Sequence, residues 1–216
     1  MSISCRLPSP GGRGITQRAI ALCAFERGAH IADIGCGRGE SVALMRGEYT
    51  LNACGIDSDK EIIREAAQKG VAGVVFGDGC SLPFADNLLD GIFYECSFSK
   101  ITEGEKALSE AARVLKYGGK IVIADFYSLE EERTFTGILG RVEKRESIEK
   151  KLADAGFRLT HFEDRSHDLM TLMGQIIFDY GKETFYQMLG AGESSFKTLK
   201  CAYGLFIAEK GERLND

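Results

Sequence analysis

Short apolar runs alternate with amphipathic stretches along most of the 216-residue chain. Runs that are apolar throughout are typical of buried strands, and stretches with apolar residues every three or four positions are typical of helices. Strands are expected at residues 31–34, 51–56, 73–76, 88–96, 120–125, 157–163 and 202–208. Helices are expected at residues 17–27, 41–46, 59–69, 104–114, 147–155, 167–180 and 183–189. This alternation predicts an α/β fold, with a parallel sheet and helices on both of its faces.

Capping and breaking residues set the ends of these elements. Thr16 is expected to cap the first helix and Gly28 to end it, while Ser58 or Asp59 caps the helix that ends at residue 69. Neither a helix nor a strand is assigned to the polar stretch 128–141. The last two strands are separated by about 40 residues with two helices and no short crossover, so one of them is expected to be inserted antiparallel.

Size and composition indicate one ordinary globular domain over residues 1–216, with an irregular arm and a helix at 1–27 before a core at 28–210. The net charge of −5 argues against a nucleic-acid-binding role. The longest apolar run, residues 19–25, is far too short for a membrane span. Seven cysteines without C-x-x-C spacing argue against disulfides and a metal site and favour the reducing cytoplasm. We expect a monomer or a homodimer.

A glycine turn follows the strand 31–34 and organises the rest of the chain. Gly35, Gly37 and Gly39 allow a positive φ and let a ligand lie against bare backbone at the strand's carboxyl end. A dinucleotide site would have a glycine where Glu40 stands. The carboxylate of Asp33 would also repel a pyrophosphate. A cationic ligand without phosphate, such as S-adenosylmethionine, therefore suits the turn better than NAD does.

The segment D-I-G-C-G-R-G at residues 33–39 resembles the D-h-G-C-G-x-G signature of class I S-adenosylmethionine-dependent methyltransferases, in particular small-molecule enzymes of the ubiquinone and menaquinone type. Further segments that resemble this family's motifs follow in its order at residues 55–58, 77–84, 112–120 and 153–157. Tyr117 replaces the proline usual in the third of these. The resemblance implies a three-layer Rossmann-like fold whose seven-stranded, mostly parallel sheet has the order 3-2-1-4-5-7-6, with the last strand antiparallel.

The resemblance also implies where the cofactor lies. Asp57 would accept the ribose hydroxyls, and Asp78 would take the adenine amino group. The full expected set is Asp33, Gly35, Cys36, Gly37, Gly39, Asp57, Ser58, Asp78, Gly79, Cys80, Glu95 and Cys96. Structural interpretations stay open for several of them: Asp57 could serve a helix dipole, Asp78 a turn, and Cys36 could be a spacer.

The expected reaction is methyl transfer to a small-molecule acceptor by in-line displacement, catalysed mainly by proximity, with S-adenosylhomocysteine as the second product. A general base is needed only if the acceptor loses a proton. Glu95, Tyr127 and His167 are the candidates, although Glu95 could instead hold the cofactor ammonium, Tyr127 could be a pocket wall and His167 a helix cap.

The acceptor site is expected to be built from residues 1–18, 97–103, 126–146 and 164–195, whose aromatic and methionine side chains suit an apolar or aromatic molecule. The arm before the first helix would act as a lid. Two other interpretations remain: a protein of this fold that binds the cofactor without transferring its methyl group, and an NAD-dependent oxidoreductase.

Overall fold

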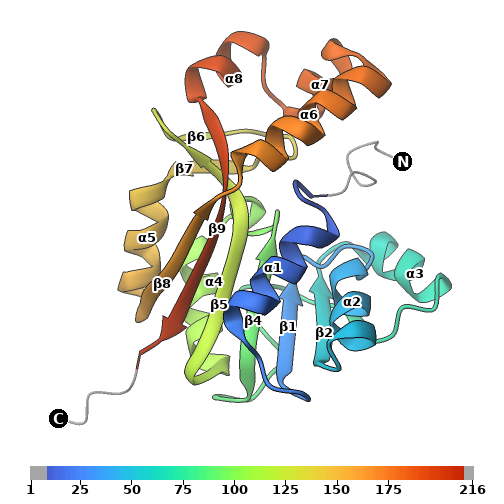
Figure 1. The fold of residues 1–216 in the computed structure, drawn as a ribbon, viewed down its shortest axis with the longest axis vertical. Helices are drawn as coiled ribbons and strands as arrows, with labels where there is room; N and C mark the ends of the chain where they lie inside the picture. The colour runs from blue at the N-terminus through green and yellow to red at the C-terminus, as the bar shows by residue number, and fades with distance from the viewer. Residues whose placement is uncertain (1–8, 212–216) are drawn as a thin grey trace.

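The computed structural model describes residues 9–211, and the N-terminal and C-terminal ends, residues 1–8 and 212–216, lie outside the described part. Its centre is a twisted sheet with helices on both faces (Figure 1). The main strands are β1 (His30–Ile34), β2 (Asn52–Asp57), β3 (Val74–Phe76), β4 (Leu89–Glu95), β5 (Leu115–Ser128), β8 (Phe157–Asp164) and β9 (Cys201–Lys210).

These strands pair in the order β3-β2-β1-β4-β5-β9-β8. β9 runs antiparallel to both of its neighbours, and the neighbouring pairs from β3 to β5 are parallel. The predicted order, with an antiparallel last strand, is confirmed. The strand count differs, because the described sheet has nine strands and not seven.

The two extra strands form a hairpin, β6 (Arg133–Thr134) and β7 (Arg141–Lys144), within the stretch that received no element from the sequence. β7 pairs with Tyr127 and Ser128 of β5. The pairing between β4 and β5 ends at Glu95 and Ala124, so β7 lies beside the part of β5 that extends past β4. β5 begins before the predicted residue 120 because Gly118, with a φ of 75°, is accommodated in a register shift and does not interrupt the strand. It extends past residue 125 because Tyr127 and Ser128 pair with β7 and β9.

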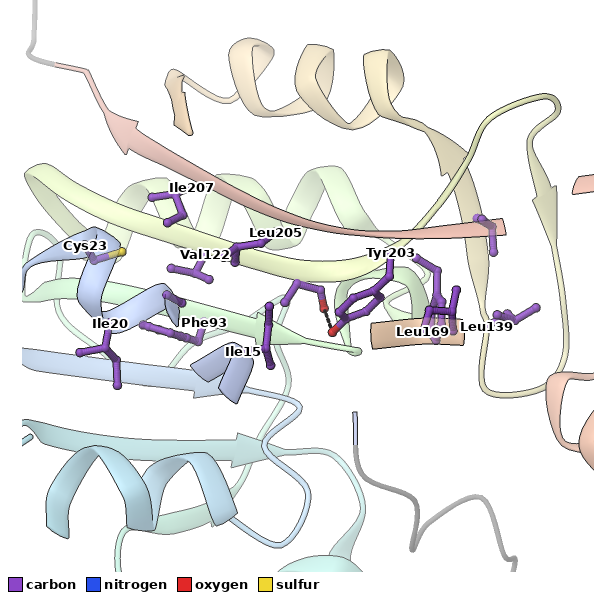
Figure 2. Packing of buried hydrophobic residues seen from close by; sticks show 14 of the residues in the cluster. Ile15, Ile20, Cys23, Phe93, Val122, Leu139, Leu169, Tyr203, Leu205 and Ile207 are labelled. Carbon is purple, nitrogen blue, oxygen red and sulfur yellow. Dashed lines mark hydrogen bonds between the residues drawn. The ribbon is translucent and has the colours of Figure 1, made fainter. Parts of the chain in front are cut away.

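Helices α1 (Arg13–Cys23) and α2 (Glu40–Glu48) pack on one face of the sheet, and α4 (Gly104–Val114) and α5 (Arg145–Asp154) on the other. Helix α3 (Lys60–Gln68) contacts β2 and β3 at the edge of the sheet. Figure 2 shows the first of these interfaces, where Ile15 and Ile20 of α1 lie near Phe93 of β4 and Leu205 of β9. Because the central strands are buried on both faces of the sheet, their sequences are continuous apolar runs.

Three helices form a cap between β8 and β9: α6 (Ser166–Tyr180), α7 (Lys182–Leu189) and α8 (Glu193–Leu199). In Figure 1 they lie beyond the carboxyl ends of the parallel strands. The cap meets the β6–β7 connection backbone to backbone. Ile138 N–H donates to Met188 C=O at 3.0 Å, and a Cβ added to Gly137 would overlap the main chain of Gly190.

The first helix differs from its prediction. It begins at Arg13 and ends at Cys23, so Thr16 lies inside it and caps nothing. Gly12, with a φ of 47°, precedes the helix, and Ala24 ends it in the left-handed conformation. Asp59, in contrast, caps α3 as expected and accepts from the N–H groups of Glu61 and Ile62. None of the helices between residues 9 and 211 is long and apolar enough to cross a membrane.

Candidate active site

The glycine turn is attached to the end of the neighbouring strand. Gly35 N–H donates to Ile56 C=O of β2 at 2.7 Å. Gly35 has a φ of 74°, and a Cβ there would overlap the Ser97 side chain, so both conformation and space require glycine. A Cβ at Gly37 would meet open space. The turn therefore presents bare backbone towards a cavity.

Asp57 holds this turn from the carboxyl end of β2. Its Oδ2 accepts from Gly37 N–H at 2.8 Å, and its Oδ1 accepts from Asp59 N–H at 2.9 Å. A carboxylate has about four lone-pair sites, so each oxygen retains capacity for a ligand hydroxyl. Asp57 faces open space on both sides, because it lines both cavities described below.

The segment after β3 forms a compact turn. Asp78 Oδ1 accepts from Cys80 N–H at 2.9 Å, and Ser81 N–H donates to Asp78 C=O at 3.0 Å. A Cβ on Gly79 would lie 2.9 Å from Ile34 Cγ2, which is tighter than side chains tolerate. These contacts bring residues 78–80 beside the end of β1.

Two acidic side chains lie under the turn on neighbouring strands. Asp33 is buried, and its Oδ2 accepts from Ser41 Oγ of α2. Glu95 Oε2 accepts from Thr16 Oγ1 at 3.0 Å. The other oxygen of each carboxyl, Oδ1 of Asp33 and Oε1 of Glu95, is buried without a hydrogen-bond partner among the described residues.

Burial of these two carboxyls disfavours their ionised forms. It raises the pKa of Asp33 to about 6, and the nearby carboxylate of Asp57 adds to the rise. Burial and the charge of Asp33 raise the pKa of Glu95 to about 8. Two unpaired buried oxygens of acidic groups favour positive charge nearby and disfavour negative charge.

Two cavities cover the carboxyl ends of the strands. One, of about 460 Å³, is lined by Ser58 and residues 77–80, and the other, of about 1190 Å³, extends from the glycine turn under the cap. They share Gly35, Asp57, Ile62, Cys96 and Lys100, so together they make one elongated site. The end of the larger cavity under the cap has an apolar wall that consists of Phe126, Ile138, Leu172 and Met188.

The expected cofactor residues all lie at the carboxyl ends of β1 to β4 or in the segments that follow. Gly39 is buried against Val74 of β3, and Cys36 packs against Gly55 of β2. Both residues therefore hold the glycine turn against the neighbouring strands. Cys96 lines both cavities, with a φ of 52° and its Sγ 3.3 Å from the Tyr203 hydroxyl.

Tyr127 and His167 are not brought to the site. Neither residue lines either of these two cavities: Tyr127 lies among the residues on the α4 and α5 side and donates to Asp164 Oδ2 at 2.7 Å. Neighbouring residues of a strand point to opposite faces, and Phe126 takes the position towards the cavity. His167 is exposed at the start of α6.

Thr16 is a site residue that the sequence interpretation assigned to a different role. It lines the larger cavity and binds Glu95 across 79 positions of the chain. The available signal is its place among the apolar residues Ile15, Ala19 and Ile20 on the buried face of α1, because a buried hydroxyl needs a partner.

The thiols are free and unsuited to metal binding where the structure describes them. The six cysteines between residues 9 and 211 form no disulfide, and no group of three or more His, Cys, Asp or Glu in that range could hold a metal ion. Burial raises the pKa of Cys36 and of Cys96, which keeps both as thiols. Cys5 lies outside the described residues.

Comparison with known proteins defines the class. Residues 32–123 match the methyltransferase domain family. The O-methyltransferase cnsE of Penicillium expansum is 37% identical over 124 residues, which are 54% of this chain and 45% of that protein. The O-methyltransferase resE of Aspergillus sclerotiorum is 29% identical over 166 residues, which are 69% of this chain and 62% of that protein.

A solved structure agrees in fold. Phosphoethanolamine N-methyltransferase 2 of Haemonchus contortus, in complex with phosphomonomethylethanolamine and S-adenosylhomocysteine, aligns with a TM-score of 0.76 at 20% identity over 94% of this chain and 54% of that one. These matches agree with the family resemblance: residues 32–123 match a methyltransferase domain, and the fold is that of methyltransferase structures. The chain spans less than two thirds of the length of the two curated relatives above.

Proposed function

We propose that the protein transfers a methyl group from S-adenosylmethionine to a small-molecule acceptor. The observation that carries the proposal is the pair of buried carboxyl oxygens of Asp33 and Glu95, unpartnered among residues 9–211, beside a glycine turn. A nucleotide with phosphates would be repelled there. S-adenosylmethionine carries an ammonium and a sulfonium, and supplies positive charge to this part of the site.

The residues present fit this cofactor along its length. Asp57 Oδ1 and Oδ2 have remaining acceptor capacity for the two ribose hydroxyls. Asp78 and the backbone of residues 79–80 would hold the adenine in the smaller cavity. The glycine turn would hold the methionine part, and the carboxyl group of Asp33, buried at the end of β1, would favour its positive charge. When bound, the cofactor supplies an activated methyl group.

The chain's own contribution is orientation and exclusion of water. Phe126, Ile138, Leu172 and Met188 would seat an apolar or aromatic acceptor in the larger cavity, under the cap. Holding two reactants in line can account for much of such a reaction's acceleration. Two relatives named O-methyltransferases and a neighbouring structure with S-adenosylhomocysteine support this assignment.

The test is calorimetric titration of the full chain with S-adenosylmethionine, S-adenosylhomocysteine and NAD. We expect the first two to bind and NAD not to bind, and the opposite result would favour an oxidoreductase. A metabolite extract incubated with methyl-labelled cofactor then decides between an enzyme and a binding protein. Cofactor that stays intact with every extract would overturn the transfer activity.

We also propose that residues 1–27 form an arm and lid helix over a core at 28–210, and that the protein works in the cytoplasm as a monomer or homodimer without nucleic acid. The net charge of −5 and the absence of C-x-x-C spacing support this assignment. Light scattering of the purified chain checks the oligomeric state.

A further inference from the structure

We propose that Glu95 is the proton acceptor of the reaction, and that the acceptor molecule is therefore a protic nucleophile: a hydroxyl, amine or thiol. This inference rests on the proposed function.

The geometry of Glu95 suits a base. One oxygen, Oε2, is held by the Thr16 hydroxyl at 3.0 Å, which fixes the orientation of the carboxyl group. The other, Oε1, is buried and has no partner among residues 9–211. Glu95 lines the larger cavity, which also contains the apolar wall, while Asp33 lines neither cavity. Of the two acids, Glu95 is therefore the one whose side chain lies at the cavity.

The groups that face Glu95 make its charge depend on what is bound. Asp33 on β1 adds negative charge. Cys96, half-buried after the end of β4, and Tyr203, buried in β9, have raised pKa values and stay neutral. Lys100 lines the same cavity but is exposed to solvent, which screens its charge. Without a cationic ligand, burial and Asp33 favour the protonated form of Glu95, and a sulfonium nearby would favour the carboxylate.

The proposed step balances in atoms and charge. The Glu95 carboxylate takes the proton from the acceptor's O–H, N–H or S–H group as the acceptor's oxygen, nitrogen or sulfur forms its bond to the methyl carbon. The carbon–sulfur bond breaks and its electron pair stays on sulfur. The site loses one positive charge from sulfur and one negative charge from the carboxylate together. The proton then leaves Glu95 to solvent when the products dissociate.

The role of Glu95 can be tested by proton-linked calorimetry, which does not require the identity of the acceptor molecule. S-adenosylmethionine and S-adenosylhomocysteine are titrated near pH 7 in two buffers of different ionisation enthalpy. We expect binding of S-adenosylmethionine to release about one proton more than binding of S-adenosylhomocysteine. Below the pKa of Glu95, the Kd of S-adenosylmethionine should fall by up to about tenfold for each unit by which the pH rises. Equal proton release by both ligands would overturn the proposal.

Variants identify the carboxyl group that releases this proton. Glu95→Gln should remove the difference between the two ligands, whereas Asp33→Asn and Thr16→Val, which keep the Glu95 carboxyl, should retain it. A difference that persists in Glu95→Gln, or that disappears only in Asp33→Asn, contradicts the assignment. Thermal melting of each variant shows that it is folded. Failure of both ligands to bind the wild-type chain would overturn the proposed function itself.

Turnover gives a second readout once the extract screen yields a product. The methyl group should lie on an atom that carried a proton. Glu95→Gln should lower kcat by about 10²-fold or more with a smaller change in KM, the usual size for loss of a general base. A product methylated on a tertiary amine or a thioether, which have no proton to lose, would overturn the inference.

Discussion

The hydroxyl of Thr16 donates a hydrogen bond of 3.0 Å to the carboxyl group of Glu95. The two residues come from α1 and from the end of β4, so this contact joins the first described helix to the floor of the site. It orients an acidic group whose other oxygen stays unpaired among the described residues.

Replacing Thr16 by valine should destabilise the protein by about 1–3 kcal/mol, because the variant leaves a second buried oxygen of Glu95 without a donor. Urea unfolding of the wild-type chain and the variant measures this. Thr16→Ser keeps the hydroxyl and is the matched control. Equal stability of the valine and serine variants would show that the hydrogen bond contributes little.

Asp57→Ala should weaken S-adenosylhomocysteine binding by about 1.5–3 kcal/mol, through loss of the ribose acceptor and of the bond to Gly37 N–H. Its neighbour Asp59 provides the control. Asp59→Ala removes the cap of α3 and should lower stability by about 1 kcal/mol while leaving affinity nearly unchanged. Calorimetry and urea unfolding of both variants separate the two roles. Wild-type affinity in Asp57→Ala would mean that the ribose is held elsewhere.

Gly35→Ala should abolish cofactor binding and destabilise the fold, because the new Cβ overlaps Ser97 and the φ of 74° is strained for alanine. Adding Ser97→Gly removes the overlap but not the strain. The double variant should therefore recover part of the melting temperature. No recovery would show that the backbone conformation, and not the collision, dominates.

Stability without ligand should fall as the pH rises from about 5 to about 8. Asp33 and Glu95 have folded-state pKa values of about 6 and about 8, above their ordinary values. The folded state therefore holds more protons than the unfolded chain across this window, and folding weakens as they are lost. Melting temperatures measured across the range test this. Glu95→Gln should flatten the upper part of the curve, and a wild-type curve that rises with pH would contradict the assignment.

Deleting residues 1–11 should reduce methyl transfer far more than the melting temperature. The deletion removes Ser9 and Pro10, which line the larger cavity, and it spares α1, which begins only at Arg13. Cofactor affinity, turnover and melting are compared with the full chain. Equal losses of activity and stability would show that the arm supports the fold and is not a lid.

The central strands β1, β4 and β5 could be located because they are buried on both faces. The order of the strands in the sheet was predictable only from the family resemblance, through motifs with an acid or a glycine at successive strand ends. The glycine turn, Asp57 and Asp78 were located by the same signals. They lie together in the structure because carboxyl ends of parallel strands share one edge. What they bind in this protein stays a prediction.

The remaining features depend on contacts between distant residues. A sequence does not say which residue of a buried apolar strand faces which side, so Tyr127 and Phe126 could not be told apart. The β6–β7 hairpin has strands of only two and four residues, too short for a hydrophobic period. Thr16 looked like a helix cap because its partner is 79 positions away.

The close approach of Gly137 to Gly190 has a consequence for how this protein could change over time. The hairpin connection and the cap are joined there by a main-chain hydrogen bond between Ile138 and Met188, and by a close approach that leaves no room for a side chain at Gly137. The side chains of Ile138 and Met188 line the larger cavity beside this contact. Substitutions of Ile138 and Met188 can therefore change the wall of the cavity, while the main-chain hydrogen bond between these two positions is kept.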